Sequence, residues 1–288
     1  MRPSPWARLH VAVLLFGLAG LFGKAVRLPP VVLVFGRTAF AAATLFGLVW
    51  LTRRRGTDLL TPPATAVFLS GALLAFHWVA FFQAIQVSSV AIALLTFSSF
   101  PLFVTLLEPL CFREPLRRSD LLTAFGVACG LVLIVPRFDL GLQSTQGALW
   151  GLLSGLSFAV LALVNRRLAG RHSPVSIAAG QNLCAACVLL PLVVPSGARP
   201  SITDLWLLGV LGVFCTAVAH VLFIGSLSQL RAQVASVVTG LEAVYGILFA
   251  FLLLGERPAL RTLAGGALVL GTVLLAGKGE ATRGKAAP

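Results

Sequence analysis

The sequence predicts an all-α membrane protein with ten transmembrane helices, arranged as two inverted repeats of five helices each. The 288-residue chain is 58% hydrophobic and only 11% charged, with a mean hydropathy of +0.97, whereas soluble domains carry about 25% charged residues. Apolar runs of about 20 residues, each long enough to cross the hydrocarbon core of a bilayer, recur from end to end. Patterns in the first half of the chain also return in the second half, at an offset of 142 to 144 positions.

Apolar windows between charged residues and Gly/Pro/Ser clusters define ten candidate spans. These spans are residues 8–26, 29–51, 64–85, 88–110, 118–136, 146–166, 174–195, 203–226, 231–253 and 260–277. The windows are continuously apolar and lack the period-two alternation of a membrane-barrel strand, so each is predicted to be a helix. The loops between them are too short to hold a soluble domain.

The distribution of Lys and Arg predicts the orientation of the chain. With the N-terminus inside, the inner loops and termini hold fifteen of these residues and the outer loops six, while Arg37 lies within a span. Because positive residues collect on the cytoplasmic side, both termini are expected in the cytoplasm, with the chain in the cell (inner) membrane. The same loop arginines account for the net charge of +13, so no nucleic-acid partner is expected.

The internal repeat assigns residues 1–140 to a first repeat and residues 141–288 to a second. The paired segments are "LPPVVLVFGRTAFAA" (28–42) with "HSPVSIAAGQNLCAA" (172–186), "HWVAFFQAIQ" (77–86) with "HVLFIGSLSQ" (220–229), and "SSFPLFVTLL" (98–107) with "GLEAVYGILF" (240–249). A block of five spans ends on the side opposite to that where it began, so the second repeat is expected to be inverted. Inverted repeats recur in secondary transporters, which bind their solutes near the bilayer midplane. Any duplicated membrane protein with an odd number of spans in each half would be inverted as well, whatever its function.

The chain resembles the EamA-type, ten-helix members of the drug/metabolite transporter superfamily over about residues 8–277. The segments that carry the resemblance are "LPPVVLVFGRTAFAA" at the second span, "SSFPLFVTLLEPLCFREPL" at the fourth and "ASVVTGLEAVYGILFAFLLLGE" at the ninth. The resemblance implies ten helices around a central cavity, cytoplasmic termini and the export of metabolites or amino acids. The chain departs from the family pattern at Phe16-Gly17, where the family often has Trp-Gly, and at Glu242-Ala243, where it often has Glu-Pro.

Ionisable residues deep in a span are costly and therefore mark candidate substrate or coupling sites. Glu242 lies eleven residues into the ninth span and is expected to bind a cationic group or a proton, or else to bond a neighbouring helix. Arg37 lies eight residues into the second span. It could hold a substrate carboxylate through its planar fork, or serve as the counter-ion of a buried carboxylate. Glu108, near the inner end of the fourth span, is expected to reach the membrane interface.

His77 and His220 occupy the same position of the repeat, so inversion would place them on opposite sides of the midplane. Histidine titrates near pH 6.5 and can relay protons, which makes the pair a candidate for proton coupling. The alternative is that each ring donates to a backbone carbonyl and stabilises its helix. Six aromatic residues are candidates to line a site for planar or apolar groups, or to serve as packing and interface anchors: Trp78, Phe81, Phe82, Phe97, Phe100 and Tyr245.

Glu114 and Glu256 occupy equivalent junctions, in "CFREPLRRSDLLTAFG" and "LLGERPALRTLAGGA". Each precedes a helix by a few residues, where a carboxylate complements the positive helix start. Each could also pair with a nearby arginine, namely Arg117, Arg118 or Arg261. Both are expected to be structural junctions that do not touch substrate.

These observations predict a secondary active transporter, a monomer or homodimer, that exports a small organic metabolite by alternating access. The metabolite would be an amino acid or a drug-like solute, and membrane lipid is the other expected partner. The chain contains no G-x-x-x-x-G-K-[ST] motif, so ATP is not expected to drive transport directly. A lipid or polyprenyl-carrier flippase on the same scaffold stays an alternative. An enzyme is disfavoured by the absence of H-E-x-x-H and G-x-S-x-G motifs, and neither a metal nor a cofactor is expected.

Overall fold

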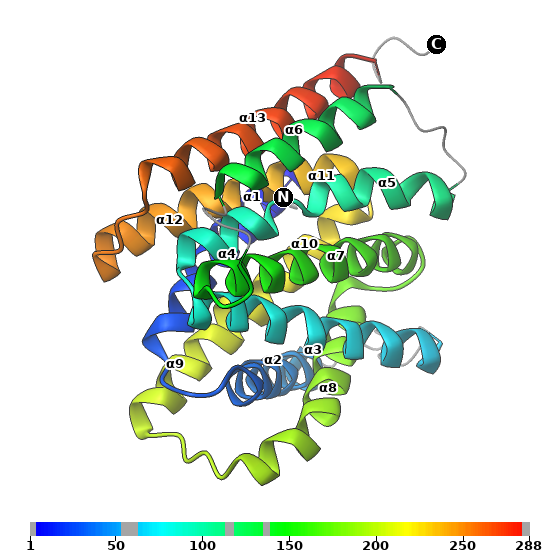
Figure 1. The fold of residues 1–288 in the computed structure, drawn as a ribbon. Coiled ribbons are helices and arrows are strands. Elements are labelled where there is room, and N and C mark those ends of the chain that lie inside the picture. Colours follow the sequence, from blue (N-terminus) through cyan, green and yellow to red (C-terminus); the bar gives the residue numbers. More distant parts are fainter. Residues whose placement is uncertain (1–3, 53–62, 113–117, 135–138, 284–288) are drawn as a thin grey trace.

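The computed structural model describes residues 4–52, 63–112, 118–134 and 139–283, and helices dominate these segments (Figure 1). The helices are α1 (Pro5–Ala25), α2 (Pro30–Thr52), α3 (Ala64–Val87), α4 (Val90–Phe97), α5 (Phe100–Phe112), α6 (Arg118–Ile134), α7 (Gln143–Ala169), α8 (Pro174–Val193), η1 (Val194–Ser196), α9 (Ile202–Gly212), η2 (Val213–Val218), α10 (Ala219–Leu227), α11 (Ala232–Thr239), α12 (Leu241–Leu254) and α13 (Leu260–Arg283). Each of the ten ranges expected from the sequence contains one helix or a run of consecutive helices. Glu114 lies outside the described residues.

By length and composition, eight helical segments of the described chain can cross a membrane. They are Pro5–Ala25, Pro30–Leu51, Ala64–Val87, Val90–Cys111, Gln143–Ala169, Pro174–Ser196, Ile202–Leu227 and Val234–Leu254. Two shorter apolar stretches, Phe125–Ile134 in α6 and Leu260–Thr272 in α13, lie where the fifth and tenth spans are expected. The chain is therefore a multi-pass membrane protein.

Local sequence signals account for where several helices begin. Ser4 caps α1 through a hydrogen bond from the Ala7 amide to its hydroxyl (3.2 Å), and proline follows it at the first helical position. Ser173 caps α8 in the same manner, again with a proline next in the chain. At α9, Ser201 and Asp204 form a reciprocal capping box. Serine caps and first-turn prolines satisfy or remove amide donors that have no partner within the helix.

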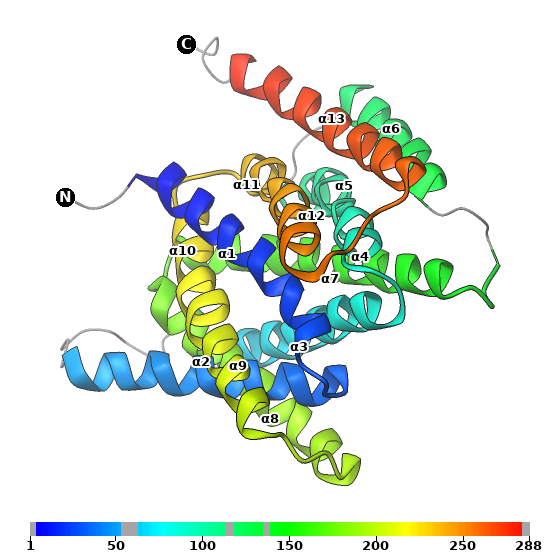
Figure 2. The same ribbon diagram turned by 90° about the vertical axis from the view of Figure 1, so that its left-hand side faces the viewer.

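The packing of the helices is symmetric under exchange of the two halves. The helices α6 and α13 lie side by side at one edge of the bundle (Figures 1 and 2), and α2 packs against α8. If residues about 143 positions apart are equated, the contact of α3 with α7 corresponds to that of α10 with α1, and the contact of α5 with α7 corresponds to that of α12 with α1. The sequence repeat is thus matched by a repeat of helix contacts.

The fourth and ninth expected spans are each broken at equivalent positions of the repeat. The first break separates α4 from α5 at Ser98 and Ser99, just before Pro101, which cannot donate a backbone hydrogen bond. The second break lies at Gly240, between α11 and α12. Because α12 starts here, Glu242 lies in its first turn, where the helix dipole favours a negative charge.

Candidate functional site

A narrow cavity lies at the centre of the bundle, where helices of both halves meet. Its walls are formed by Phe16, Ala19, Arg37, Leu74, His77, Trp78, Phe81, Phe97, Phe158, His220 and Glu242. The space open to the centre of a water molecule is about 20 Å³, and one water needs about 10–15 Å³ of such space. The walls must therefore move apart before an organic solute can enter.

Five of the residues predicted from the sequence line this cavity together: Glu242, His77, His220, Arg37 and Trp78. They come from α12, α3, α10 and α2, so the site combines helices from both halves of the chain. Their proximity is what the structure adds, and their roles in binding or coupling stay predictions.

Arg37 is held in place by three neighbours. Its side chain is 1% exposed; Nε donates to the Thr216 hydroxyl at 3.0 Å and Nη2 donates to the Cys215 carbonyl at 3.3 Å. The guanidinium carbon lies 3.9 Å from the centroid of the Trp78 ring, a cation–π arrangement. These contacts do not use Nη1, which leaves that end of the fork for another partner.

The acceptors that hold Arg37 come from η2, a π-helical turn between α9 and α10. Thr216 donates from its hydroxyl to the carbonyl of Leu211, five residues earlier, at 2.8 Å. The wider turn interrupts the regular hydrogen-bond ladder, and the Cys215 carbonyl accepts from Arg37. No sequence signal pointed to this turn. Within the described residues no carboxylate lies within ion-pair distance of Arg37, and the interpretation as the counter-ion of a buried carboxylate stays a prediction.

Glu242 faces the cavity from the opposite half of the chain. Its side chain is only 6% exposed, yet in the described part of the chain no hydrogen bond or ion pair reaches its carboxylate. Glu242 and Arg37 therefore share one space without contacting each other. A solute that carries both a cationic and an anionic group could bridge them.

The two histidines differ in how their rings are held. His77 Nδ1 lies 3.0 Å from the Ser154 carbonyl and 2.9 Å from the Ser154 hydroxyl; a protonated Nδ1 can donate to either, and an unprotonated Nδ1 can accept from the hydroxyl. His220 Nδ1 lies 3.2 Å from the Asn182 amide nitrogen; because that nitrogen only donates, the ring proton is on Nε2. A backbone carbonyl therefore lies within bonding distance of Nδ1 in His77 and not in His220, where the contact is to an amide side chain.

The predicted aromatic residues fall into two groups. Trp78 lines the cavity between Arg37 and His220, with its ring edge-on to the imidazole at 5.9 Å. Phe100 lies behind the wall, stacked on Phe97 at 5.2 Å. Tyr245 packs where α1 and α12 approach each other at Gly17. Phe81 and Phe97 also line the cavity, whereas Phe82, Phe100 and Tyr245 do not.

Two lining phenylalanines, Phe16 and Phe158, were not among the candidates from the sequence. Their rings meet that of Phe223, at 5.8 Å and 5.4 Å respectively. The only sequence signal for either was the Phe16-Gly17 departure, because the family often has an aromatic tryptophan at this place.

Glu256 joins the two halves at one end of the bundle. Its carboxylate accepts from the backbone amides of Val90 and Ala91, each at 3.2 Å, at the start of α4. Next to this contact, Lys24 donates to the carbonyl of Ser88 at 3.0 Å. Glu256 thus complements a helix start, as expected. The helix is α4 in the other half of the chain, and not α13, which follows Glu256 in the sequence.

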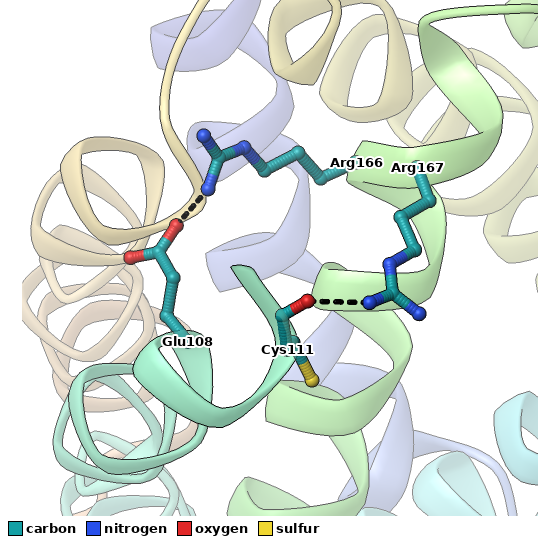
Figure 3. A network of polar contacts seen from close by, with 4 residues as sticks. All are labelled: Glu108, Cys111, Arg166 and Arg167. Carbon is teal, nitrogen blue, oxygen red and sulfur yellow. Dashed lines mark hydrogen bonds and ion pairs between the residues drawn. The ribbon is translucent and has the colours of Figure 1, made fainter. Parts of the chain in front are cut away.

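A second polar junction joins α5 to the end of α7 (Figure 3). Arg166 pairs with Glu108, and Arg167 donates to the carbonyl of Cys111. Glu108 is 2% exposed, so its carboxylate is sheltered by the protein, and a position at the membrane interface stays a prediction. Arg166 supplies an opposite charge inside the protein, which offsets the cost of removing the carboxylate from water.

Comparison with known proteins places these features in a family. A model described as the EamA-like transporter family matches residues 8–135 and again residues 145–277. An uncharacterized transporter of Archaeoglobus fulgidus is 30% identical over 196 residues, which cover 68% of this chain and 70% of that protein. The pseudopaline exporter CntI of Pseudomonas aeruginosa is 27% identical over 244 residues, 84% of each chain. The S-adenosylmethionine uptake transporter of Rickettsia conorii is 25% identical over 207 residues, 72% of this chain and 69% of that one.

One solved crystal structure has a closely similar fold. It superposes with a TM-score of 0.73, covers 96% of both chains and is 21% identical in sequence. At this identity the likeness concerns the fold alone.

Proposed function

The chain belongs to the EamA-like transporter family, and we propose that it is a secondary active transporter that exports a zwitterionic organic metabolite across the cell membrane. Amino acids, and compounds that carry an amino-acid group, have the required chemistry. Transport would proceed by alternating access around the central cavity.

The observation that carries this proposal is the pair Arg37 and Glu242, which line one cavity without contacting each other. An ionised residue at the centre of a transmembrane helix costs about 2.5–3.5 kcal/mol. A solute carboxylate at Arg37 Nη1 and a solute ammonium at Glu242 would satisfy both charges at once. The surrounding aromatic rings would pack against the apolar part of the solute.

The alternating-access scheme also rests on the arrangement of the helices. We propose that ten helices cross the membrane as two inverted repeats, residues 1–140 and 141–288, with both termini in the cytoplasm. The exchange symmetry of the helix contacts, the equivalent breaks near Ser98 and Gly240 and the family match in each half support this arrangement. A pair of inverted halves can rock between two related states.

The direction and the driving ion belong to the same proposal. Export is favoured by the relative that matches more of this chain, CntI, which is named as an exporter, whereas the Rickettsia relative is named for uptake. Coupling to protons is proposed because His77 and His220 line the same cavity as the two charges.

A lipid or polyprenyl-carrier flippase is the second candidate. It is favoured by an apolar groove on the outside of α2, bordered by Phe35 and Phe40 and by Leu205 and Leu208 of α9. Such a groove suits an acyl or polyprenyl chain. Among the described residues that line it, the groove has no charged side chain to hold a headgroup, so the zwitterion transporter is preferred.

The test is efflux of radiolabelled amino acids from cells that express the wild type or the Glu242→Gln variant. Efflux is expected to fall by about tenfold or more, because the isosteric amide cannot pair with an ammonium and each lost 1.4 kcal/mol is a factor of ten. Asp204→Asn is the matched control, since Asp204 serves an exposed helix cap away from the cavity. Equal efflux from the wild type and Glu242→Gln at equal expression would refute the proposal, and leaflet exchange of labelled lipid in liposomes would establish the flippase instead.

A further inference from the structure

Next to His220, three completely buried amide side chains gather between α7, α8 and α10. They are Asn165, Gln181 and Asn182, each 0% exposed. Gln181 donates from Nε2 to Asn165 Oδ1 at 2.7 Å, and Asn182 donates from Nδ2 to the Ala178 carbonyl at 2.8 Å and contacts His220 Nδ1 at 3.2 Å. Asn182 is the member that contacts the ring lining the cavity, and Gln181, the residue before it in α8, bonds Asn165 of α7.

The bonds within this cluster leave three buried polar atoms without a partner among the described residues: Asn165 Nδ2, Gln181 Oε1 and Asn182 Oδ1. Buried polar atoms are nearly always hydrogen-bonded, to protein or to ordered water. One donor and two acceptors match the bonding capacity of water, which gives two hydrogen bonds and accepts others. A cation would suit the two oxygens but would be repelled by the amide hydrogens of Asn165.

The repeat-related histidine has no such surroundings. His77 Nδ1 is satisfied by Ser154, and its ring lies among Phe81, Phe97 and Phe158, with the Phe158 centroid at 4.8 Å. The counterparts of Gln181 and Asn182 in the first half are Arg37 and Thr38. Arg37 is bonded to η2, and the Thr38 hydroxyl donates to carbonyls of its own helix.

Asn182 can serve His220 in both protonation states. The neutral ring accepts from the amide nitrogen of Asn182 at Nδ1, whereas a protonated ring needs an acceptor at that position. The unused Asn182 Oδ1 becomes this acceptor if the amide turns over; the amide nitrogen then exchanges its bond to the Ala178 carbonyl for one to water. His77 Nδ1 instead contacts the hydroxyl and the carbonyl of Ser154, at 2.9 Å and 3.0 Å, and no amide with a spare buried oxygen contacts it among the described residues.

We infer that Asn165, Gln181 and Asn182 form a buried hydration site beside His220, and that water in this site delivers the proton that His220 takes up. A hydronium ion transfers one proton to Nδ1 and leaves a neutral water molecule, while Asn182 Oδ1 accepts the new N–H. Other titratable or charged groups around α10 are Arg37, His77 and Glu242 at the cavity, Cys215 in η2, Arg8 of α1 beside Gly225, and Arg231 before α11. The coupling role rests on the proposed function, whereas the hydration site does not.

Deuterium exchange at the Cε1–H of each histidine, followed by mass spectrometry of the purified full-length chain, tests this inference. This exchange requires a protonated ring in contact with solvent, and His77 is the internal control. We expect His220 to exchange about tenfold faster than His77, because buried water reaches only the former. The double variant Asn165→Leu, Gln181→Leu should lower the deuterium-exchange rate of His220 to that of His77. Ser154→Ala should leave the exchange rate of His220 unchanged.

A second variant covers the case in which the double variant does not fold. Asn182→Asp places a permanent acceptor at His220 Nδ1 and is expected to speed exchange at His220 and not at His77. The inference is overturned if His220 exchanges no faster than His77, or if the folded variants leave its rate unchanged. If the protein transports no amino acid, but His220 exchanges fast and the cluster variants slow this exchange, the transporter proposal alone is refuted.

Discussion

The guanidinium of Arg37 lies over the ring of Trp78, with its central carbon 3.9 Å from the ring centroid. The same side chain donates to Thr216 and Cys215, so Arg37 joins α2, α3 and the π-helical turn η2 at the wall of the cavity. A desolvated cation–π contact contributes about 2 kcal/mol, and hydrogen bonds to a charged group contribute about 1.5–3 kcal/mol each. The position of this wall therefore depends on a planar, forked cation.

Arg37→Lys should consequently impair solute binding although it keeps the charge. A lysine ammonium cannot donate in the fork geometry while stacking on Trp78. We expect the solute-dependent rise in thermal stability of the purified protein to require about tenfold more amino acid, which corresponds to 1.4 kcal/mol. Arg261→Lys, which alters an arginine that bonds the end of α6, should behave as the wild type. An unchanged dose response for Arg37→Lys would contradict the assignment of Arg37 to the binding site.

The ion pair between Glu108 and Arg166 should show strong energetic coupling. Because Glu108 is buried, Arg166→Gln leaves an uncompensated carboxylate, and a change of this kind costs about 3–5 kcal/mol. The double variant Glu108→Gln, Arg166→Gln should be less destabilised than the sum of the single variants, by about 1–3 kcal/mol. Unfolding of the four proteins in denaturant gives the double-mutant cycle. Strictly additive effects would show that the junction contributes nothing as a pair.

Glu256→Gln should loosen the start of α4. The amide retains one acceptor but loses the charge that complements two backbone amides, a loss of about 1 kcal/mol, as for other helix caps. Hydrogen exchange should accelerate in a peptide that covers Val90 and Ala91, and it should not accelerate at α9. Asp204→Asn provides the converse control, because Asp204 completes the capping box at the start of α9, so in this variant hydrogen exchange should accelerate there and not at α4. Unaltered exchange at Val90 and Ala91 would exclude Glu256 as the cap of α4.

Gly17→Ala should destabilise the contact between α1 and α12. A Cβ at this position would lie 2.8 Å from the Tyr245 Cβ and 3.1 Å from the Glu242 carbonyl oxygen, so the helices must separate, at a cost of about 1–3 kcal/mol. Gly47→Ala is the matched control, because a Cβ there meets nothing within 4 Å and alanine favours a helix by about 1 kcal/mol. The midpoint temperature of thermal unfolding should fall for Gly17→Ala and should not fall for Gly47→Ala. Equal midpoints would show that α1 can shift freely against α12.

Arg27 and Arg171 test the proposed inversion of the two halves. They stand 144 positions apart, at equivalent loops of the repeat, and both are exposed. Single cysteines at these positions, in a background without the five native cysteines, should react with a membrane-impermeant maleimide from opposite sides of the membrane. We expect labelling of Arg27→Cys in intact cells, and of Arg171→Cys only after permeabilisation. Labelling of both from one side would refute inverted repeats.

The helices could be predicted from the sequence because their causes are local. Apolar runs of membrane length, serine caps such as Ser4 and Ser173, and prolines at helix starts are all readable along the chain, and the structure places helices in all ten expected ranges. The candidates Glu242, Arg37, His77, His220 and Trp78 could be selected as well, because a charge or a repeated histidine inside an apolar run is unusual. Membership of the transporter family also follows from the sequence pattern.

By itself, then, the sequence determined the helical segments, the repeat and the short set of polar residues that a membrane protein has to shelter. Only the tertiary structure decided which partner shelters each one. Arg37 is bonded by a π-helical turn 178 and 179 residues away, Glu108 by an arginine 58 residues away, and Glu256 binds the start of a helix in the other half. Sequence periodicity specifies which face of a helix is apolar, but the partner of a buried polar group is set by how whole helices pack, and that packing brings distant segments together.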